Sequence, residues 1–274
     1  MDSIEKIGHS LIQHGCFNNR IYLLKFDKRD QADLTKRLNE LAQKNAYGKI
    51  ITKVPESANP IFLKDGYKQE AYIPEFYKDG EGVFFMAKYF NNERAQVPNK
   101  FLTELSGLLA SPRVNEATLP VHFSLKITEP SNAGKMAQIY REVFKTYPFP
   151  ILNASYLEKT MLEGKVIYFG IWDNGKLAGL SSAELDSSNR NAEMTDFAVL
   201  PEYRGQKLAY FLLQRMEEEM RIRQFKTLYT IARLNSQGMS KTFINHGYHY
   251  SGLLKNNTNI SGQIESMTVF YKNI

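Results

Sequence analysis

One short segment in the second half of the chain constrains its fold more than any other. Residues 197–213 read as a strand that ends at Pro201, a short loop, and a helix that begins at once. The first N–H groups of such a helix have no intrahelical acceptor, and the helix dipole adds partial positive charge there. Gly205 allows close backbone approach and Arg204 adds a fixed positive charge. An ordinary strand-to-helix turn is the alternative, but the whole string favours a site for phosphate groups.

Alternating elements surround this segment from residue 122 onward. Strand patterns lie at 122–128, 165–172, 176–185, 191–200, 226–232, 248–254 and 264–272, and helical spacing lies at 131–147, 155–163, from 208 onward, and at 236–246. Asn174-Gly175 predicts a hairpin turn, and Gly247 suits a helix C-terminus. The order βααβββαβαββ predicts an α/β (α+β) domain over residues 122–274.

The first half reads as a degenerate copy of the C-terminal part of that domain. Adding 181 to the numbering places Phe62 on Phe243 and Gly66 on Gly247, and it superimposes the helix at 32–44 on 213–225. The strand Arg20–Phe26 reaches its helix without a glycine, so this copy lacks the phosphate loop. We expect residues 1–95 to extend the sheet, cover its edge or wall the substrate site. Residues 96–121 form a connector with a helix at 100–109.

Composition narrows the functional classes. The 274 residues are 43% hydrophobic and 23% charged, which suits a packed core. No apolar run approaches the roughly 18–20 residues of a membrane span, and residues 1–6 do not resemble a secretory signal. A single cysteine, Cys16, agrees with a reducing cytoplasm, where we expect the protein. The net charge of +6 is scattered, which favours a mildly basic surface over nucleic-acid binding. The histidines show no metal-ligand spacing, so no metal is expected.

The phosphate-loop segment resembles the pyrophosphate loop of the GNAT superfamily, Gln/Arg-x-x-Gly-x-Gly/Ala, and the resemblance covers residues 122–274. It implies a GNAT fold with a mixed, mostly antiparallel sheet flanked by helices, and acetyl-CoA as co-substrate. Lys207 stands where the family usually has glycine; a lysine fits there if its φ is helical, with its ammonium near the phosphates. The implied acetyl-CoA contacts are Phe197, Ala198, Val199, Arg204, Gly205, Gln206, Lys207, Leu208, Ala209 and Asn235.

The same resemblance points to candidate catalytic residues. Glu193 matches the glutamate that takes the amine proton, because an ammonium cannot attack a thioester. Strict alternation puts Asp196 on the opposite face of the strand. There it either pairs with a cationic substrate or has a structural role. Phe243 occupies the position of the family's thiolate-protonating tyrosine. The thiolate then leaves unassisted, or another tyrosine substitutes, with Tyr248 preferred and Tyr250 a further choice.

The acceptor is suggested by a closer likeness to the β-lysine N-acetyltransferases. It rests on the two-part layout, the Tyr147-Pro-Phe-Pro150 segment and the string Glu193–Val199. The likeness implies acetylation of the ε-amine of L-β-lysine to Nε-acetyl-β-lysine, a compatible solute, in a ternary complex, with Tyr147 and Phe149 at the acceptor pocket. Another small amine, a polyamine or a protein lysine is the alternative acceptor, and a non-catalytic acyl-CoA sensor is the alternative class. The sequence does not decide whether the protein forms a homodimer.

Overall fold

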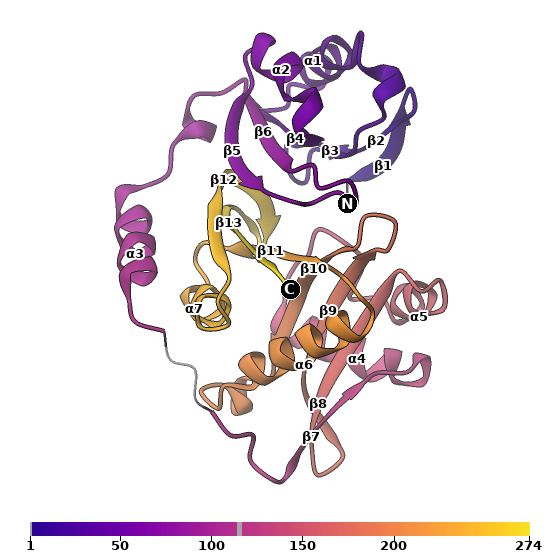
Figure 1. The fold of residues 1–274 in the computed structure, drawn as a ribbon, viewed down its shortest axis with the longest axis vertical. Helices are drawn as coiled ribbons and strands as arrows, with labels where there is room; N and C mark the ends of the chain where they lie inside the picture. The colour runs from indigo at the N-terminus through magenta and orange to yellow at the C-terminus, as the bar shows by residue number, and fades with distance from the viewer. Residues whose placement is uncertain (1, 114–116) are drawn as a thin grey trace.

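The structure is a computed structural model that describes residues 2–113 and 117–274. In chain order its main elements are β1 (Ser3–Ile7), β2 (Ser10–Gly15), β3 (Arg20–Lys25), α1 (Leu34–Lys44), β4 (Lys49–Pro55), α2 (Asn59–Lys64), β5 (Lys68–Ile73), β6 (Val83–Tyr89), α3 (Asn99–Ala110), β7 (Phe123–Ile127), α4 (Ala133–Val143), α5 (Ala154–Leu162), β8 (Val166–Asp173), β9 (Lys176–Asp186), β10 (Asn191–Val199), α6 (Leu208–Ile222), β11 (Thr227–Arg233), α7 (Gln237–Asn245), β12 (His249–Ile260) and β13 (Gln263–Asn273). Figure 1 shows their arrangement.

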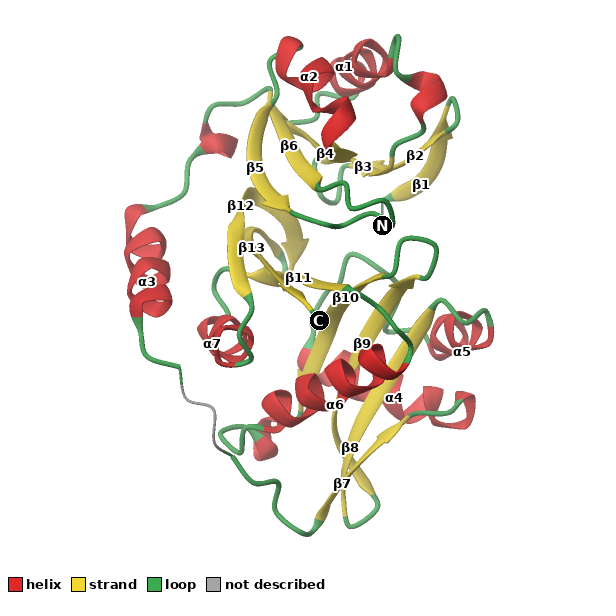
Figure 2. Cartoon of the chain, in the orientation of Figure 1, coloured by secondary structure: helices red, strands yellow, loops and turns green. Residues whose placement is uncertain are grey.

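Within the described residues the strands form one sheet of 13, in the order β1-β2-β3-β4-β6-β5-β12-β13-β11-β10-β9-β8-β7. β3 and β4 pair in parallel, as do β10 and β11, and the remaining pairs are antiparallel. In the second half α6 packs on one face of β8–β10, while α4 and α5 cover the other (Figure 2). The predicted mixed, mostly antiparallel sheet flanked by helices is confirmed.

The two halves share one topology. The run β3-α1-β4-α2-β5-β6 has the same strand order and directions as β10-α6-β11-α7-β12-β13. The register agrees as well, because Lys49 pairs with Tyr89 and Thr230 pairs with Phe270, each 181 positions later. This is the offset at which the sequence repeat was predicted. The domain boundaries at 95/96 and 121/122 stay a prediction.

The loop before the first helix is where the halves differ. Arg20 of β3 is separated by 29 residues from its partner Lys49, against 36 between Asn191 and Thr227. The first half therefore connects its parallel strands through a shorter path, which agrees with the predicted lack of a phosphate loop there.

The halves join where β5 meets β12. Ala71 pairs with Gly252, and these two positions are themselves 181 apart, so each strand meets its own counterpart across an approximate two-fold axis. The contact is close: a Cβ on Gly252 would lie 2.0 Å from the carbonyl oxygen of Glu70. Buried cations reinforce the junction, since Lys49 donates to the Lys255 carbonyl and Arg20 to the Asn257 carbonyl. The first half thus extends the sheet, one of its predicted roles.

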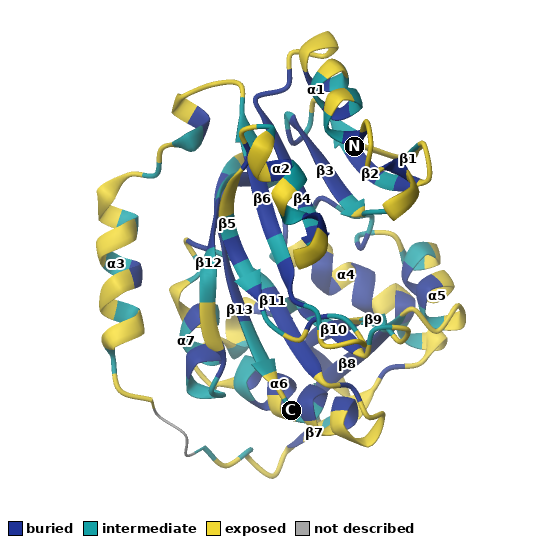
Figure 3. Ribbon diagram, turned by 45° about the horizontal axis from the view of Figure 1, so that its top comes forward, coloured by how far each residue is buried: buried dark blue, intermediate teal, exposed yellow. Residues whose placement is uncertain are grey.

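Burial follows the amphipathic patterns of the sequence. The long strands of the sheet are largely buried, whereas α3 stands away from the sheet and is mostly exposed (Figure 3). The apolar face of α6, which begins where helical spacing was predicted, is buried against β8–β11, with Leu212 and Met216 fully enclosed. One core cluster draws on both halves, joining Ile51 of β4 with Tyr229 of β11 and Val269 of β13.

Some boundaries differ from the predicted ones. α4 ends at Val143, four residues before the predicted end at Tyr147: Phe144 is already extended, and Pro148 disfavours helical dihedrals at Tyr147. β12 runs on to Ile260 because it pairs with β13 beyond a bulge. The connector helix is present as α3, and residues 114–116 of the connector lie outside the described residues. Of the helices described, none is both long and apolar enough to cross a membrane.

Candidate active site

The predicted phosphate loop lies between β10 and α6. A 3₁₀ turn at Pro201–Tyr203 leads to Arg204, then to Gly205 with φ of 83°, and α6 begins at Leu208. A Cβ on Gly205 would meet nothing within 4 Å, so its positive φ is what calls for glycine, and the open space lets a ligand approach the backbone. The Tyr210 amide, which donates to the Lys207 carbonyl at 2.9 Å, begins the intrahelical hydrogen bonding. The amides before it are placed to bind an anion.

Lys207 does not meet the condition stated for a lysine at this position, which was a helical φ. Its φ is 57° and its ψ is 24°, the left-handed conformation. That region costs a residue with a Cβ about 1–2 kcal/mol, whereas glycine enters it freely. The lysine is accommodated in another way: the loop keeps the left-handed geometry that suits glycine, and Lys207 adopts it.

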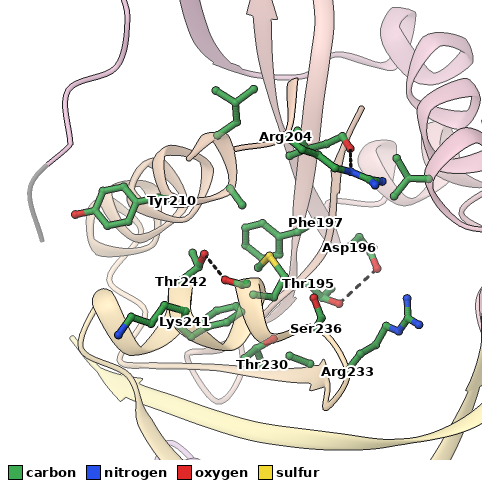
Figure 4. A pocket seen from close by; sticks show the side chains of 18 of the residues that line it. Thr195, Asp196, Phe197, Arg204, Tyr210, Thr230, Arg233, Ser236, Lys241 and Thr242 are labelled. Carbon is green, nitrogen blue, oxygen red and sulfur yellow. Dashed lines mark hydrogen bonds between the residues drawn. The ribbon is translucent and has the colours of Figure 1, made fainter. Parts of the chain in front are cut away.

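β10 and β11 separate beyond their first residues and enclose a cavity. They pair only along Asn191–Glu193 and Thr227–Tyr229. Beyond this point both strands line a cavity of about 740 Å³, which reaches the phosphate loop and α7 (Figure 4). Along the cavity the described strands form no ladder pairs with each other. An extended ligand that carries amide groups can hydrogen-bond to both strands there.

A β-bulge sits at the end of this cavity. Thr195 pairs with Ser182 and Ala198 with Leu180, so β10 carries one more residue than β9 between these pairs. Asp196, in the bulge, has φ of 56° and is only 6% exposed. Its carboxylate accepts hydrogen bonds from the Tyr147 hydroxyl at 2.5 Å and from the Ser182 hydroxyl at 2.6 Å.

The bulge corrects the prediction that Asp196 faces away from Glu193. Glu193 pairs directly across from Glu184, and Glu184 shares a strand face with Ser182, two residues away on β9. Because Asp196 hydrogen-bonds to Ser182, it lies on that face as well. Alternation failed because the extra residue of the bulge shifts the side-chain period by one.

Three carboxyl groups therefore share one face of β9 and β10. Like charges on directly opposed residues are unfavourable, so the pairing of Glu193 with Glu184 is costly without a cationic partner. Burial raises the pKa of Glu193 to about 7, against the lowering effects of the Lys53 charge and a hydrogen bond from Tyr229. Desolvation by the surrounding protein raises the pKa of Glu184, and the charges of Glu193 and Asp196 add to this; because the residue is exposed, solvent weakens the effect.

The first half contributes to the same face. Lys53 of β4 places its Nζ 5.8 Å from the ring centroid of Phe76 and 5.9 Å from that of Tyr229, the residue paired with Glu193. Tyr22 of β3 is also near: burial raises the pKa of its phenol above the usual range, and the Glu193 charge adds to this. The site thus combines an anion loop, a slot between strands, a carboxyl group poised as a base near neutral pH, and an acidic surface for a cation.

Comparisons with known proteins agree with this arrangement. The family model described as "Acetyltransferase (GNAT) family" matches residues 135–248. A β-lysine N(6)-acetyltransferase of Methanococcus maripaludis is 40% identical over 276 residues, covering 99% of each chain. The chain belongs to the GNAT family of N-acetyltransferases. The N-acetyltransferase YodP of Bacillus subtilis is 31% identical over the full length of both chains. A β-lysine N(6)-acetyltransferase of Methanosarcina mazei is 34% identical over 158 residues, 58% of each chain.

As a GNAT acetyltransferase the protein uses acetyl-CoA, and the predicted contacts fall mostly around the cavity. Those lining it are Phe197, Val199, Arg204, Gly205, Lys207, Leu208 and Ala209. Ala198 is buried toward α4 instead, and Gln206 and Asn235 are exposed and outside the lining. The open approach at Gly205 and the amides at the start of α6 fit a pyrophosphate. Among the described residues no cluster of three or more acidic, histidine or cysteine side chains is arranged to hold a metal ion.

Of the residues predicted to bind the acceptor or to protonate the thiolate, only some line the cavity. Tyr147 lines the GNAT cavity, whereas Phe149 packs in the cluster beneath α4 and α5 without lining it. Tyr248 does not suit the predicted role of proton donor to the thiolate. It is 2% exposed, lies behind Phe243 with ring centroids 5.0 Å apart, and does not line the cavity. Tyr250 lies outside the lining as well, against Phe270.

Two residues at this site, Glu184 and Lys53, were not predicted from the sequence. Glu184 follows from the hairpin between β9 and β10: once Asp186 is paired with Asn191, counting back places Glu184 opposite Glu193. Lys53 carried no local signal, because it lies 140 residues before Glu193 and reaches it only through the joining of the two halves.

Proposed function

We propose that this GNAT acetyltransferase transfers the acetyl group of acetyl-CoA to the ε-amine of L-β-lysine, giving Nε-acetyl-β-lysine, by direct attack in a ternary complex. The observation that carries the proposal is the acidic face formed by Glu184, Glu193 and Asp196 at the end of the cavity between β10 and β11. Such a face suits an acceptor with two ammonium groups. The names of the two β-lysine N(6)-acetyltransferases support this choice of diamine.

Acetyl-CoA is bound by the second half alone in this proposal. The amides that follow Gly205, at the start of α6, hold the pyrophosphate, with Arg204 as a nearby positive charge. The facing edges of β10 and β11 hold the pantetheine arm, and Phe197 and Val199 pack against it. Bound in this way, acetyl-CoA supplies an activated thioester carbonyl near the bulge.

Glu193 and Asp196 act on the acceptor. Asp196 lines the cavity and holds the reacting ammonium, oriented in turn by the hydroxyls of Tyr147 and Ser182. Glu193 accepts the proton that the ammonium must lose, and its pKa of about 7 suits a base at neutral pH. Glu193 lies two residues before Thr195 and does not line the cavity, so we assign this transfer to a short chain of bridging waters.

The departing sulfur leaves without help from Phe243, which carries no proton to donate. A thiol with a pKa of roughly 8.5 is a sufficient leaving group as the thiolate. The reaction turns the β-lysine cation into a net-neutral zwitterion, which suits a compatible solute, and we place it in the cytoplasm.

The test is an acceptor comparison with the purified full-length chain. Acetyl transfer from acetyl-CoA is measured by coenzyme A release and mass spectrometry for L-β-lysine, L-lysine and spermidine. We expect kcat/KM for β-lysine to exceed the other two values by at least about 10-fold, the discrimination that one well-placed charged contact provides. Equal rates on β-lysine and lysine would remove the assignment, and coenzyme A binding without turnover on any amine would indicate a sensor.

A further inference from the structure

The face of the sheet that carries the acidic residues changes from negative to positive charge along its length. The negative groups lie on β9 and β10 of the second half, and the positive groups lie on β3 and β4 of the first. On β4, alternation puts Lys49, Ile51 and Lys53 on this face, and Ile51 packs with Tyr229 in the shared core cluster. The catalytic half therefore meets a cationic surface that only the first half supplies.

Most cations of that surface are already engaged. The ammonium of Lys49 is 2.7 Å from a Glu70 carboxylate oxygen and is fully buried. The guanidinium of Arg20 donates to the Asn257 carbonyl and to the Thr258 hydroxyl, and it is nearly fully buried. Neither group can turn toward a ligand without breaking these bonds.

Lys53 differs from both. In the described part of the chain no carboxylate oxygen lies within 4.0 Å of its Nζ, which lies instead near the rings of Phe76 and Tyr229. Its side chain is only partly buried, so a ligand in solvent can reach it. The carboxylate of Glu193 is close enough for the Lys53 charge to act on it, yet the two do not form an ion pair. The ammonium of Lys53 thus lies near the acidic face without a carboxylate partner, so it can bind one from a ligand.

The spacing matches the proposed acceptor. Strand β10 rises about 3.3 Å per residue, so Glu193 lies roughly 7–10 Å along the strand from Asp196. In L-β-lysine the ε-nitrogen and the carboxylate carbon are six bonds apart, about 7–8 Å when extended. With the reacting amine at Asp196, the carboxylate reaches the level of Glu193 and Tyr229, where Lys53 sits.

We propose that Lys53, supplied by the first half, binds the carboxylate of the acceptor and selects amino acids over polyamines. This inference rests on the proposed function. A diamine without a carboxylate would leave Lys53 opposite an apolar or cationic part of the ligand, with nothing to pair with it. The first half then serves as the specificity wall of a site whose acetyl-CoA contacts and base lie in the second half.

The test uses three acceptors and a series of variants at Lys53. L-β-lysine and 6-aminohexanoate carry the carboxylate, and 1,4-diaminopentane is β-lysine without it. The variants are Lys53→Gln, Lys53→Glu and the conservative Lys53→Arg, with Lys64→Gln on the exposed surface of α2 as a matched control. Steady-state kcat and KM are measured for each pair, with circular dichroism and thermal melting to verify folding.

We expect Lys53→Gln to lower kcat/KM by about 10- to 100-fold for both carboxylate-bearing acceptors, mainly through KM, as expected for a lost hydrogen bond between charged groups. The value for 1,4-diaminopentane should stay within about 2-fold or rise, Lys53→Glu should favour the diamine further, and Lys53→Arg should restore most of the loss. Equal losses on all three acceptors with a shifted pH profile would mean that Lys53 only tunes Glu193, and unchanged kinetics would also overturn the inference. If the parent protein does not acetylate β-lysine at all, the proposed function fails instead.

Discussion

Replacing Glu193 by glutamine should make the protein more stable at alkaline pH and much less active. The carboxyl has its pKa raised from 4.5 to about 7, so between these values the folded state binds more protons than the unfolded state. Stability from this group is therefore present at low pH and is lost as pH rises through about 7. Each pKa unit corresponds to about 1.4 kcal/mol, so the ionised carboxylate costs up to about 3 kcal/mol above pH 7. Glutamine removes that cost.

The assay combines denaturation with kinetics. Urea unfolding at pH 5 and pH 8 should give a Glu193→Gln stabilisation that is small at pH 5 and grows to between about 1 and 3 kcal/mol at pH 8. Acetyl transfer at pH 7.5 should fall by about 10²- to 10⁴-fold, the range for loss of a general base. Because Glu184 is directly opposite, the two carboxyls titrate together, and Glu184→Gln is the matched control. Glu184 is exposed and solvent screens its charge, so this substitution should stabilise the protein less at pH 8 than Glu193→Gln does, and it should keep far more activity. A Glu193→Gln protein that is less stable at pH 8, or that keeps activity within about 3-fold, would refute the reasoning.

Other substitutions test separate parts of the structure. Lys207→Gly should raise the free energy of unfolding by about 1 kcal/mol, measured by urea denaturation, because glycine adopts φ of 57° without strain; a loss of stability would contradict the loop geometry. Gly252→Ala should lower the melting temperature by several degrees because its Cβ would lie 2.0 Å from the Glu70 carbonyl, while Gly238→Ala, which meets nothing within 4 Å, should be neutral or stabilising; equal effects would show that the junction is not tight. Tyr248→Phe should keep kcat within about 3-fold, whereas Tyr147→Phe should raise the acceptor KM by about 5- to 20-fold because Asp196 loses a hydrogen bond to a charged group; the reverse pattern would restore Tyr248 as the proton donor.

The parts of the fold that could be predicted from the sequence are those that local chemistry determines. The strand–loop–helix segment around Gly205 and the hairpin at Asn174-Gly175 are specified by neighbouring residues, and both formed where expected. The repeat at an offset of 181 was readable because the order and spacing of the elements survive when most identities are lost. The pairing of Lys49 with Tyr89 and of Thr230 with Phe270 keeps the same offset.

The acidic face needed information that no local pattern holds. The single extra residue of the bulge places the Asp196 side chain on the face opposite to the predicted one. Strand periodicity does not reveal a bulge unless the cross-strand register is known. Glu217 shows the same limit on a helix: it stands four residues before Arg221, a spacing typical of exposed ion pairs, yet its carboxylate is buried and accepts a hydrogen bond from Lys272 at 2.8 Å. The surroundings of both Asp196 and Glu217 are thus determined by a neighbouring strand rather than by adjacent residues in the sequence.

The most direct test of the whole account is the position of the acetyl group on the product. The purified protein is incubated with acetyl-CoA and L-β-lysine at pH 7.5, and two-dimensional NMR identifies which nitrogen is acylated. The account predicts a single product acetylated on the ε-nitrogen, because the reacting amine lies at Asp196 while the carboxylate end of the acceptor lies toward the first half. Acetylation of the β-nitrogen, or of both nitrogens equally, would contradict that orientation, and no product at all would contradict the proposed reaction.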